Sequence, residues 1–495
     1  MKNIITIPAL FLATLSVSFG QSVTFDSTFG VNGIAYIGLN NNNANAYGDD
    51  FVLQPDGKIL IAGRSTGSIY AIQRYYPDGS RDTAFNIIQP GYLTGYGLGL
   101  QPDGKIVFYS DKGLYRYYPS GAADSTFGTN GTVHMKPISS NNALQVLADG
   151  KIAVGAGFDA FYAARIHPDG TVDSTFGTNG EVKYDLSPTD VDIAYTLNAY
   201  PDGRLLLGGF TSLGGWKLSL LRLNPDGSAD STFGINGWVR YGLKGSSECY
   251  GVVIQADEKI LLTGYTAVTF TAGQIEGIVA RLNTDGSFDQ SFGNGGVRYF
   301  PQFLEGTSIA VAPDNKIVVI GHTYSFPKDT LHVVRLLENG QNDPGFGKDG
   351  VYVCPVTSHF FRTVHLDAKE RIVVSGFNPS SASTNSGFLM RFKVRTASVS
   401  APEEHDNIDL TASYYPNPVA DVGHLKFHLP NPGGLSLGLM DVYGRIIHQF
   451  FNNRYFETGA QQITLRLPVE LPAGRYTLQL IYGRTAQYVP LIKLP

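Results

Sequence analysis

Arginine and aspartate recur at one fixed spacing through most of the chain. Six times an Arg is followed by Gly, Asp and Phe at offsets of five, eight and eleven residues. A seventh Arg, Arg391, lacks its Asp, while Asp26 and Phe29 stand near the N-terminus without an Arg before them. We therefore predict seven pairs: Arg74–Asp82, Arg116–Asp124, Arg165–Asp173, Arg222–Asp230, Arg281–Asp289, Arg335–Asp343 and Arg391–Asp26.

Two chemistries are open to seven guanidinium–carboxylate pairs. They could form repeated ligand or ion sites, or each Arg could bind its Asp through charge-assisted hydrogen bonds that stabilise a turn. A ligand site is normally asymmetric, whereas the spacing is constant in every copy. We interpret the pairs as structural, and the Phe of each copy as a side chain that packs between repeats.

The remaining residues form no local catalytic motif. The sequence has no His-Glu-x-x-His, no Gly-x-Ser-x-Gly, no phosphate-binding loop and no Cys-x-x-Cys. We assign no catalytic residue, no metal ligand and no cofactor. The segment from Asn40 to Asn43 with Asp49 and Asp50 offers oxygen ligands to calcium, but a solvated polar loop is the simpler interpretation. Catalysis by residues from several repeats stays open.

The elements that carry the Arg–Asp frame are predicted to be short strands. A turn signature such as Pro55-Asp56-Gly57-Lys58 precedes each complete frame, a worn copy precedes Arg391, and β-branched or aromatic runs flank the turns. Pro, Asp and Gly in this order favour a tight turn, so each signature predicts a β-hairpin. A third strand carries the frame Arg, and a fourth follows the frame Phe.

Seven copies of a four-stranded unit are typical of a β-propeller. The period of the repeat is 42–59 residues. Because Asp26 supplies the partner that Arg391 lacks, we predict that the strand around residues 33–37 closes the ring beside the strand of Arg391. Closure hides two sheet edges that would otherwise invite aggregation. The predicted fold is all-β: a seven-bladed β-propeller closed by the N-terminal strand, followed by a small C-terminal β-sandwich.

The repeats resemble the delta-60 repeat of secreted bacterial proteins. The shared features are an Asp-x-x-Phe-Gly segment, a Gln-Pro-Asp-Gly-Lys-Ile turn and a strand that ends in Gly, over about residues 23–394. The resemblance implies a propeller-like fold and brings no assigned activity. Glu258 and Asn315 depart from the pattern, since each replaces the Gly of its turn.

Recognition is expected in the loops between the second and third strands of each blade. These loops reach one face of the disc, and the Pro-Asp-Gly turns reach the other. The segment from the basic residue of the hairpin to the frame Arg varies from 11 to 22 residues, so the loops on this face differ from blade to blade. Loops on a rigid scaffold usually carry recognition. The candidate ligand-binding residues are Phe158, Phe210, Trp216, Tyr265, Tyr324, Phe326 and His359. Their wider neighbourhood includes Phe360, His322 and Asn378. Aromatic rings beside polar groups suit a glycan or a peptide, although packing between blades explains any single ring as well.

The N-terminal segment predicts export. Lys2, the largely apolar stretch from Ile4 to Val17 and the small residues before Gln21 are typical of a signal peptide of residues 1–20. No later stretch reaches the ~18 apolar residues of a spanning helix. The formal net charge of −5 comes without a basic run, which argues against a nucleic-acid partner. We expect Cys249 and Cys354 to be buried and unpaired, and the protein to be a monomer.

The C-terminal region predicts a separate domain. Residues 396–409 are polar and acidic, as in a linker between a ring of residues 21–395 and a domain of residues 410–495. Alternating strands with Gly and Pro turns predict a small β-sandwich. The segment resembles the type A C-terminal sorting domain of the type IX secretion system of Bacteroidetes. The matching positions are Tyr415, Pro416, Asn417, Pro418, Gly444, Gly474, Tyr476 and Lys493.

That resemblance implies a route out of the cell. The protein would pass through the periplasm, meet the type IX secretion machinery and reach the outer-membrane surface or the medium, where this domain is removed. An ordinary carbohydrate-binding-like sandwich is the alternative.

Two functions fit the sequence. The first is a secreted or cell-surface binding or adhesion protein whose variable loops bind an extracellular glycan or peptide. The second is an extracellular polysaccharide hydrolase or lyase with catalytic residues spread over several blades. The absence of a local motif favours the first. A cluster of carboxylates or histidines at the mouth of the channel on the loop face would favour the second.

Overall fold

The fold is built entirely from strands. The computed structural model describes residues 23–37, 46–65, 69–90, 95–135, 144–157, 159–186, 189, 191–268, 275–301, 305–323, 330–357, 360–378, 386–394, 412–429, 431–441, 446–482 and 485–494. These ranges contain 36 strands, and none of them holds a helix long and apolar enough to cross a membrane. The chain separates into two compact units, Met1–Ala397 and Ser398–Pro495.

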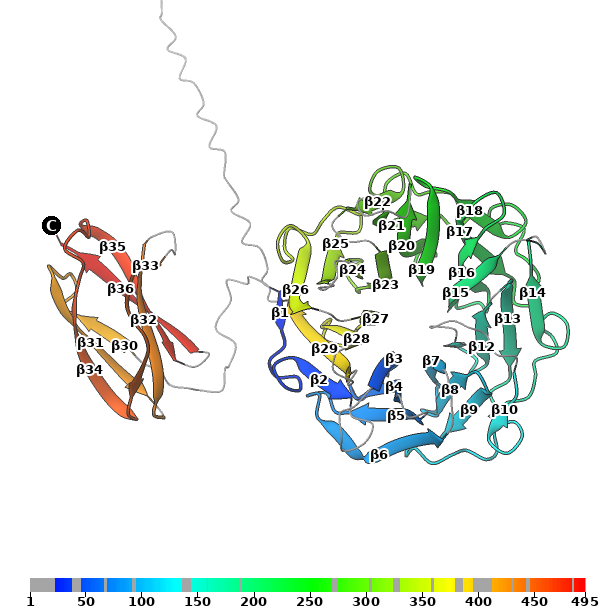
Figure 1. The fold of residues 1–495 in the computed structure, drawn as a ribbon, viewed down its shortest axis with the longest axis horizontal. Helices are drawn as coiled ribbons and strands as arrows, with labels where there is room; N and C mark the ends of the chain where they lie inside the picture. Colours follow the sequence, from blue (N-terminus) through cyan, green and yellow to red (C-terminus); the bar gives the residue numbers. More distant parts are fainter. Residues whose placement is uncertain are drawn as a thin grey trace, which may run out of the picture. The chain divides into compact units, whose positions relative to one another are not determined.

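The first unit is a ring of sheets around a common centre (Figure 1). Its described residues form seven sheets, which we number as blades in chain order. Blade 1 consists of β3 (Ala46–Leu53), β4 (Ile59–Ser65), β5 (Ile69–Tyr75) and β6 (Arg81–Pro90). Blade 2 consists of β7 (Gly95–Leu100), β8 (Ile106–Ser110), β9 (Gly113–Tyr117) and β10 (Thr132–Val133). Blade 3 consists of β11 (Leu144–Val146), β12 (Ile152–Ala156), β13 (Phe161–Ile166) and β14 (Glu181–Tyr184).

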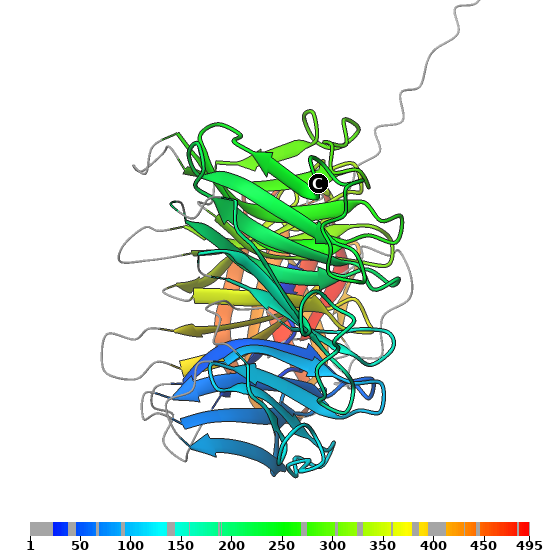
Figure 2. The same cartoon turned by 90° about the vertical axis from the view of Figure 1, so that its right-hand side faces the viewer.

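The second half of the ring repeats this order of strands. Blade 4 consists of β15 (Asp192–Ala199), β16 (Leu205–Thr211), β17 (Lys217–Leu223) and β18 (Trp238–Tyr241). Blade 5 consists of β19 (Ser246–Ile254), β20 (Ile260–Ala267), β21 (Ile275–Leu282) and β22 (Val297–Phe300). Blade 6 consists of β23 (Glu305–Val311), β24 (Ile317–Thr323), β25 (Thr330–Leu336) and β26 (Val351–Thr357). Seen from the side, the strands run across the thickness of the disc (Figure 2).

Blade 7 is completed by the start of the chain. Its own strands are β27 (Phe360–Leu366), β28 (Ile372–Asn378) and β29 (Ser386–Val394). Both β1 (Val23–Phe25) and β2 (Ile34–Ile37) pair antiparallel with β29, with Thr24 opposite Lys393 and Tyr36 opposite Phe388. The predicted closing strand, β2, is therefore present, and β1 is a second N-terminal strand that pairs with β29. The prediction of an all-β propeller is confirmed.

The core of the ring is divided between the blades. Seven hydrophobic clusters of described residues each lie between two consecutive blades. In one of them Ile72 and Phe85 of blade 1 pack against Leu98 and Phe108 of blade 2. Both faces of a blade are thus covered, so a middle strand such as β8 is buried at every position, and its residues are apolar or aromatic except Ser110.

Each frame Arg joins a turn, an aromatic ring and the next blade. In all seven pairs the Arg Nε lies 2.7–2.8 Å from Oδ2 of its Asp. The guanidinium lies 4.3–4.9 Å from the centroid of a frame Phe ring. In six described pairs Nη1 also donates to a main-chain carbonyl of the following blade, as Arg391 does to Pro77. The Asp26–Arg391 pair makes these contacts across the closing seam.

Six frame carboxylates have a lowered pKa: Asp26, Asp82, Asp124, Asp173, Asp230 and Asp289. Burial alone would raise the pKa of Asp124, but hydrogen bonds from Thr126 and the charge of Arg116 lower it to about 2. The Thr126 hydroxyl donates to Asp124 Oδ1, which leaves Oδ2 for Arg116. These geometries fit a structural role for the pairs.

The hairpin turns require a residue with positive φ. Gly57 and Gly203 have φ of 81° and 91°, and Glu258, Asn315 and Glu370 take φ of 62°, 62° and 57° at the same place. A non-glycine residue costs roughly 1–2 kcal/mol in this conformation. The ring therefore keeps its turn geometry where the sequence loses the glycine.

The second unit is a β-sandwich. One sheet has the order β30 (Ala412–Tyr415), β31 (Val422–Leu429), β34 (Gly459–Arg466). The other has the order β33 (Ile446–Phe456), β32 (Gly433–Met440), β35 (Gly474–Tyr482), β36 (Thr485–Lys493). Their shared core holds Leu425, Leu437, Leu478 and Leu491 and draws on this unit alone.

Candidate functional site

The central channel has two chemically different ends. Each innermost strand, such as β15 or β19, finishes at its Pro-Asp-Gly turn or the counterpart of that turn. We call this the turn end of the channel. The opposite end, where the innermost strands begin and the loops between second and third strands lie, is the loop end.

The predicted ligand residues fall into three groups. Phe158, Tyr324, Phe326 and His359 lie outside the described residues. Trp216 lies just before β17 at the loop end and is 42% exposed. The other two are Phe210 and Tyr265, which are only 3% and 7% exposed.

The burial of Phe210 and Tyr265 corrects their predicted place in loops. The second strands of blades 4 and 5 continue to Thr211 and Ala267. Phe210 and Tyr265 therefore lie within strands, and their side chains are buried inside the propeller. Only Trp216, among the described candidates, offers a large ring surface to solvent.

A continuous row of aromatic rings begins at Trp216. Successive ring centroids are 5.0 Å apart from Trp216 to Phe210, 6.0 Å from Phe210 to Tyr195, 5.1 Å from Tyr195 to Tyr250 and 5.8 Å from Tyr250 to Tyr265. We call these five residues the aromatic row. It crosses from blade 4 to blade 5 at the loop end, and its tilted rings favour edge and offset contacts.

The aromatic row ends on a buried acid. Glu248 is 4% exposed, and the Tyr265 hydroxyl donates to its Oε1 at 2.7 Å. Burial raises the pKa of Glu248, and hydrogen bonds from the hydroxyls of Tyr265, Tyr195 and Tyr250 oppose that rise. Three tyrosines of the row therefore share one carboxylate.

A second acid lies on the neighbouring blade. Glu305 begins β23, and its Oε1 is 3.0 Å from Nε2 of His322 on β24. The charge of Glu305 also contributes to the raised pKa of Glu248. The His322 ring is 6.2 Å from Phe360 of blade 7, which stacks on Phe377 at 5.1 Å. Carboxylates, a histidine and aromatic rings thus gather along the loop end from blade 4 to blade 7.

Sequence reasoning missed four of these residues: Tyr195, Tyr250, Glu248 and Glu305. A positional signal exists for the first two. Each described innermost strand except the short β11 contains a β-bulge. The residue six positions before the turn Pro or its counterpart lies in that bulge, and it is Asp49, Tyr96, Tyr195, Tyr250, Thr307 or Arg362. Bulges re-aim side chains and are frequent beside functional sites.

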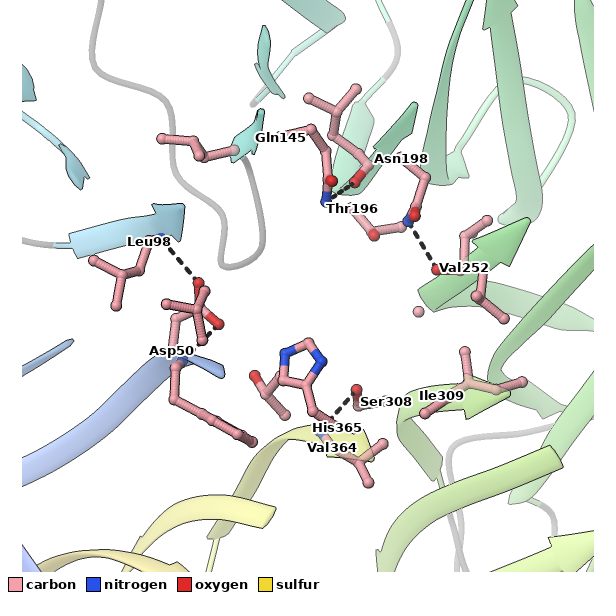
Figure 3. A pocket seen from close by; sticks show the side chains of 18 of the residues that line it. Asp50, Leu98, Gln145, Thr196, Asn198, Val252, Ser308, Ile309, Val364 and His365 are labelled. Carbon is pink, nitrogen blue, oxygen red and sulfur yellow. Dashed lines mark hydrogen bonds between the residues drawn. The ribbon is translucent and has the colours of Figure 1, made fainter. Parts of the chain in front are cut away.

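The channel itself encloses a polar cavity of about 520 Å³ (Figure 3). Side chains on its wall bind the free edge of the next blade. The Asn198 amide donates to the Val252 carbonyl at 2.8 Å, and Asp50 Oδ2 accepts from the Leu98 amide at 2.9 Å. The Ser308 hydroxyl accepts from the Val364 amide at 3.2 Å. The polar wall therefore supplies partners for edge groups that the sheets leave open.

Two titratable residues on this wall have shifted pKa values. Burial raises the pKa of Asp50 to about 7, against the opposing hydrogen bonds from the amides of Leu98 and Phe51. Burial lowers the pKa of His365 to about 4, although part of its ring faces the channel. No group of three or more His, Cys, Asp or Glu among the described residues has the arrangement of a metal site.

Most positions of the predicted sorting motif lie in strands and turns of the second unit. The Asn417 amide donates to the Pro490 carbonyl at 2.8 Å, and its Oδ1 accepts from the Ile492 amide at 2.8 Å. Tyr415 Oη is 3.1 Å from Gln462 Oε1, and Tyr476 donates to the Pro472 carbonyl at 2.9 Å. The buried Lys493 Nζ is 3.1 Å from Asp421. Pro416 and Pro418 follow Tyr415 and Asn417, Gly474 begins β35, and Gly444 lies outside the described residues.

Several solved structures are similar to this chain at low sequence identity. PorZ, an essential bacterial surface component of the type IX secretion system of Porphyromonas gingivalis, is 11% identical, with 92% of this chain and 60% of PorZ covered and a TM-score of 0.38. This chain thus spans about three fifths of PorZ. Drosophila semaphorin 2a is 7% identical over 92% of this chain and 98% of its own, with a TM-score of 0.45. Drosophila plexin A, solved in complex with semaphorin 1b, is 11% identical over 71% and 86%, with a TM-score of 0.38. No curated protein matches the sequence.

A family model matches the repeats themselves. The family is described as a domain of unknown function, the DUF5122 beta-propeller, and it matches residues 54–85, 147–176, 201–233, 255–292 and 312–346. Each matched stretch begins at or near a hairpin turn and ends on a frame Phe. The chain is therefore similar to this propeller family over five of its repeats.

Proposed function

We propose that this protein is an exported binding protein that recognises an extracellular glycan at the loop end of blades 4–7. The observation that carries the proposal is the aromatic row, which runs from the exposed Trp216 to the acid–tyrosine contacts of Glu248. Sugars present alternating C–H faces and hydroxyl groups. An exposed indole offers the apolar surface, and nearby carboxylate, imidazole and phenol groups offer hydrogen bonds.

Hydrogen bonds hold the backbone around Trp216. The main-chain carbonyl of Trp216 accepts a hydrogen bond from the Ser247 amide of blade 5 at 3.2 Å. Its loop is further held by Arg240, which donates from Nε to Thr211 Oγ1 at 2.8 Å and from Nη2 to the Leu213 carbonyl. Such preorganisation reduces the entropy lost on binding.

The proposed route of export rests on the two ends of the chain. Residues 1–20 act as a signal peptide, and the second unit acts as a type IX sorting domain that brings the protein through the periplasm to the cell surface or the medium. The second unit has its own hydrophobic core, which suits a domain that is recognised and removed separately.

Polysaccharide cleavage is the second candidate function. Glu248 and Glu305 lie on adjacent blades at the loop end, and His322 lies 3.0 Å from Glu305. A carboxyl group whose pKa is raised, as that of Glu248 is, can serve as a general acid, while a second carboxylate or an imidazole serves as a base. The two glutamates are the residues on which this function would depend.

The test of binding is a glycan and peptide array probed with the full chain, followed by product analysis on each hit. Trp216→Ala should weaken binding of the glycan hit by about 1–3 kcal/mol, as for a hot-spot aromatic residue. Tyr36→Ala is the matched control, because Tyr36 is 50% exposed on β2, which pairs with β29 in blade 7, whereas the aromatic row lies on blades 4 and 5. A hit confined to peptides, or equal losses in both variants, would contradict the glycan site. Cleavage products that vanish in Glu248→Gln would establish the second function.

The test of export is separate. Removal of residues 410–495 should leave a folded ring in the periplasm, because the ring and the second unit have different cores. Fractionation with an antibody to the ring measures where it accumulates. Normal levels of the truncated protein outside the cell would show that another part of the chain carries the address.

A further inference from the structure

One cation stands among the seven innermost strands. Arg362 of β27 is the only Lys or Arg within the described strands β3, β7, β11, β15, β19, β23 and β27. It lies in the β-bulge between Phe361 and Val364, and it is half-buried. Thr363 and Val364, the next residues of the strand, line the channel cavity, so Arg362 lies just beyond the cavity at the loop end.

The contacts of Arg362 are aromatic. Its guanidinium carbon is 5.5 Å from the centroid of Phe377, and Phe377 stacks on Phe360 at 5.1 Å. Its Nε is buried and has no hydrogen-bond partner among the described residues. The seven frame arginines differ sharply, since each binds an Asp through Nε. A partly buried guanidinium without an acid is costly.

The described acids near the loop end already have partners. Glu305 Oε1 lies 3.0 Å from His322 Nε2. Glu248 accepts from Tyr265 at 2.7 Å. Further along the channel, Asp50 accepts from the amides of Leu98 and Phe51, each at 2.9 Å. Among the described residues, no carboxylate pairs with Arg362, so its charge is not compensated by an acid.

We propose that Arg362 binds an anionic group of the ligand, and that the recognised glycan is acidic, carrying uronate carboxylates or sulfate esters. The inference rests on the proposed function and names the substrate class of the same site. A planar guanidinium forms two parallel hydrogen bonds with a carboxylate or sulfate, and such bonds gain strength when water is partly excluded. The Phe360–Phe377 stack holds the guanidinium plane at the edge of the channel, and the aromatic row binds the sugar faces.

The experiment compares three polymers on the full chain: polygalacturonate, dextran sulfate and neutral dextran. We expect binding of one or both anionic polymers and weaker binding of dextran. Arg362→Gln should weaken binding of the anionic polymer roughly 10- to 100-fold, the range of one charge-assisted pair. Arg362→Lys should recover only part of the affinity, because an ammonium group keeps the charge and loses the fork. Preference between polygalacturonate and dextran sulfate identifies the anion.

Arg298 is the matched control. It lies on the outer strand β22, its guanidinium carbon is 5.6 Å from the Phe300 centroid, and its Nε is likewise buried without a hydrogen-bond partner among the described residues. Its Nη2 donates to Asn342 Oδ1 at 3.3 Å, so Arg298→Gln should perturb the fold at least as much as Arg362→Gln and leave binding unchanged. Melting temperatures of both variants check their relative stability.

The outcomes separate this inference from the function on which it rests. If Trp216→Ala abolishes glycan binding while Arg362→Gln leaves it unchanged, the glycan site stands and the anion subsite is wrong. Equal binding of dextran and the anionic polymers would overturn the subsite in the same way. If the full chain binds no glycan in the array or among these polymers, both proposals fall.

Discussion

The turn end and the loop end of the ring use charged residues in opposite ways. At the turn end the same Arg, Asp and Phe recur in every blade, and each guanidinium is satisfied at 2.7–2.8 Å. At the loop end the chemistry occurs once: Glu248, Glu305, His322 and Arg362 each belong to a single blade. Residues that recur in every blade stabilise the ring, whereas residues that occur in one blade can distinguish one ligand from another. The difference can be tested by damaging each end in turn.

Loss of the closing strands should have the largest effect. Deletion of residues 23–37 removes Phe29 and Ile37 from the cluster between blades 7 and 1, and it leaves Arg391 buried without Asp26. We expect loss of the cooperative thermal transition of the ring, measured by calorimetry. Deletion of residues 412–494 is the control, because that unit has its own core, and the transition of the ring should survive it. A ring that melts normally without residues 23–37 would show that closure does not stabilise it.

Arg222→Ala should cost about 3–5 kcal/mol of unfolding free energy, because it leaves the buried Asp230 without its guanidinium partner and removes the hydrogen bond to the Thr284 carbonyl of blade 5. Trp216→Ala should change stability by less than about 1 kcal/mol, since its side chain is 42% exposed. Urea unfolding and glycan affinity measured on both variants give the comparison. Were Trp216 the stability position and Arg222 the binding position, the roles assigned to the two ends would be reversed.

The turn end could be predicted from the sequence, and the loop end only in part. The repeat places one residue type at one spacing in every blade, so a single structural explanation covers all the copies. Trp216 was identified because it lies in a loop of variable length. Tyr195 and Tyr250 lie in bulges of innermost strands. Tyr250 shares β19 with Glu248, whereas Tyr195 of blade 4 reaches Glu248 only because neighbouring blades pack side by side. No local pattern announces Glu248 or Glu305.

A smaller effect is expected from the channel wall, where two shifted pKa values act in opposite directions. Asp50 has a folded pKa of about 7, above its unfolded value, so the folded state binds more protons between about pH 4 and 7. Stability from this residue falls as pH rises through that range. His365 has a folded pKa of about 4, below its unfolded value, so its contribution falls as pH drops from about 6.5 to 4.

The two residues therefore offset each other in the wild-type protein, and single variants should expose each one. Asp50→Asn keeps an acceptor for the Leu98 amide and removes the loss of unfolding free energy that Asp50 causes as pH rises to about 7. The unfolding free energy of this variant should therefore rise more steeply with pH than that of the wild type. Between pH 7 and pH 4, the unfolding free energy of His365→Gln should fall less than that of the wild type. The His365 effect should be the smaller, because part of its ring faces the channel. Urea titrations at pH 4, 5.5 and 7 measure both slopes, and parallel curves for all three proteins would show that neither residue titrates across this window on folding.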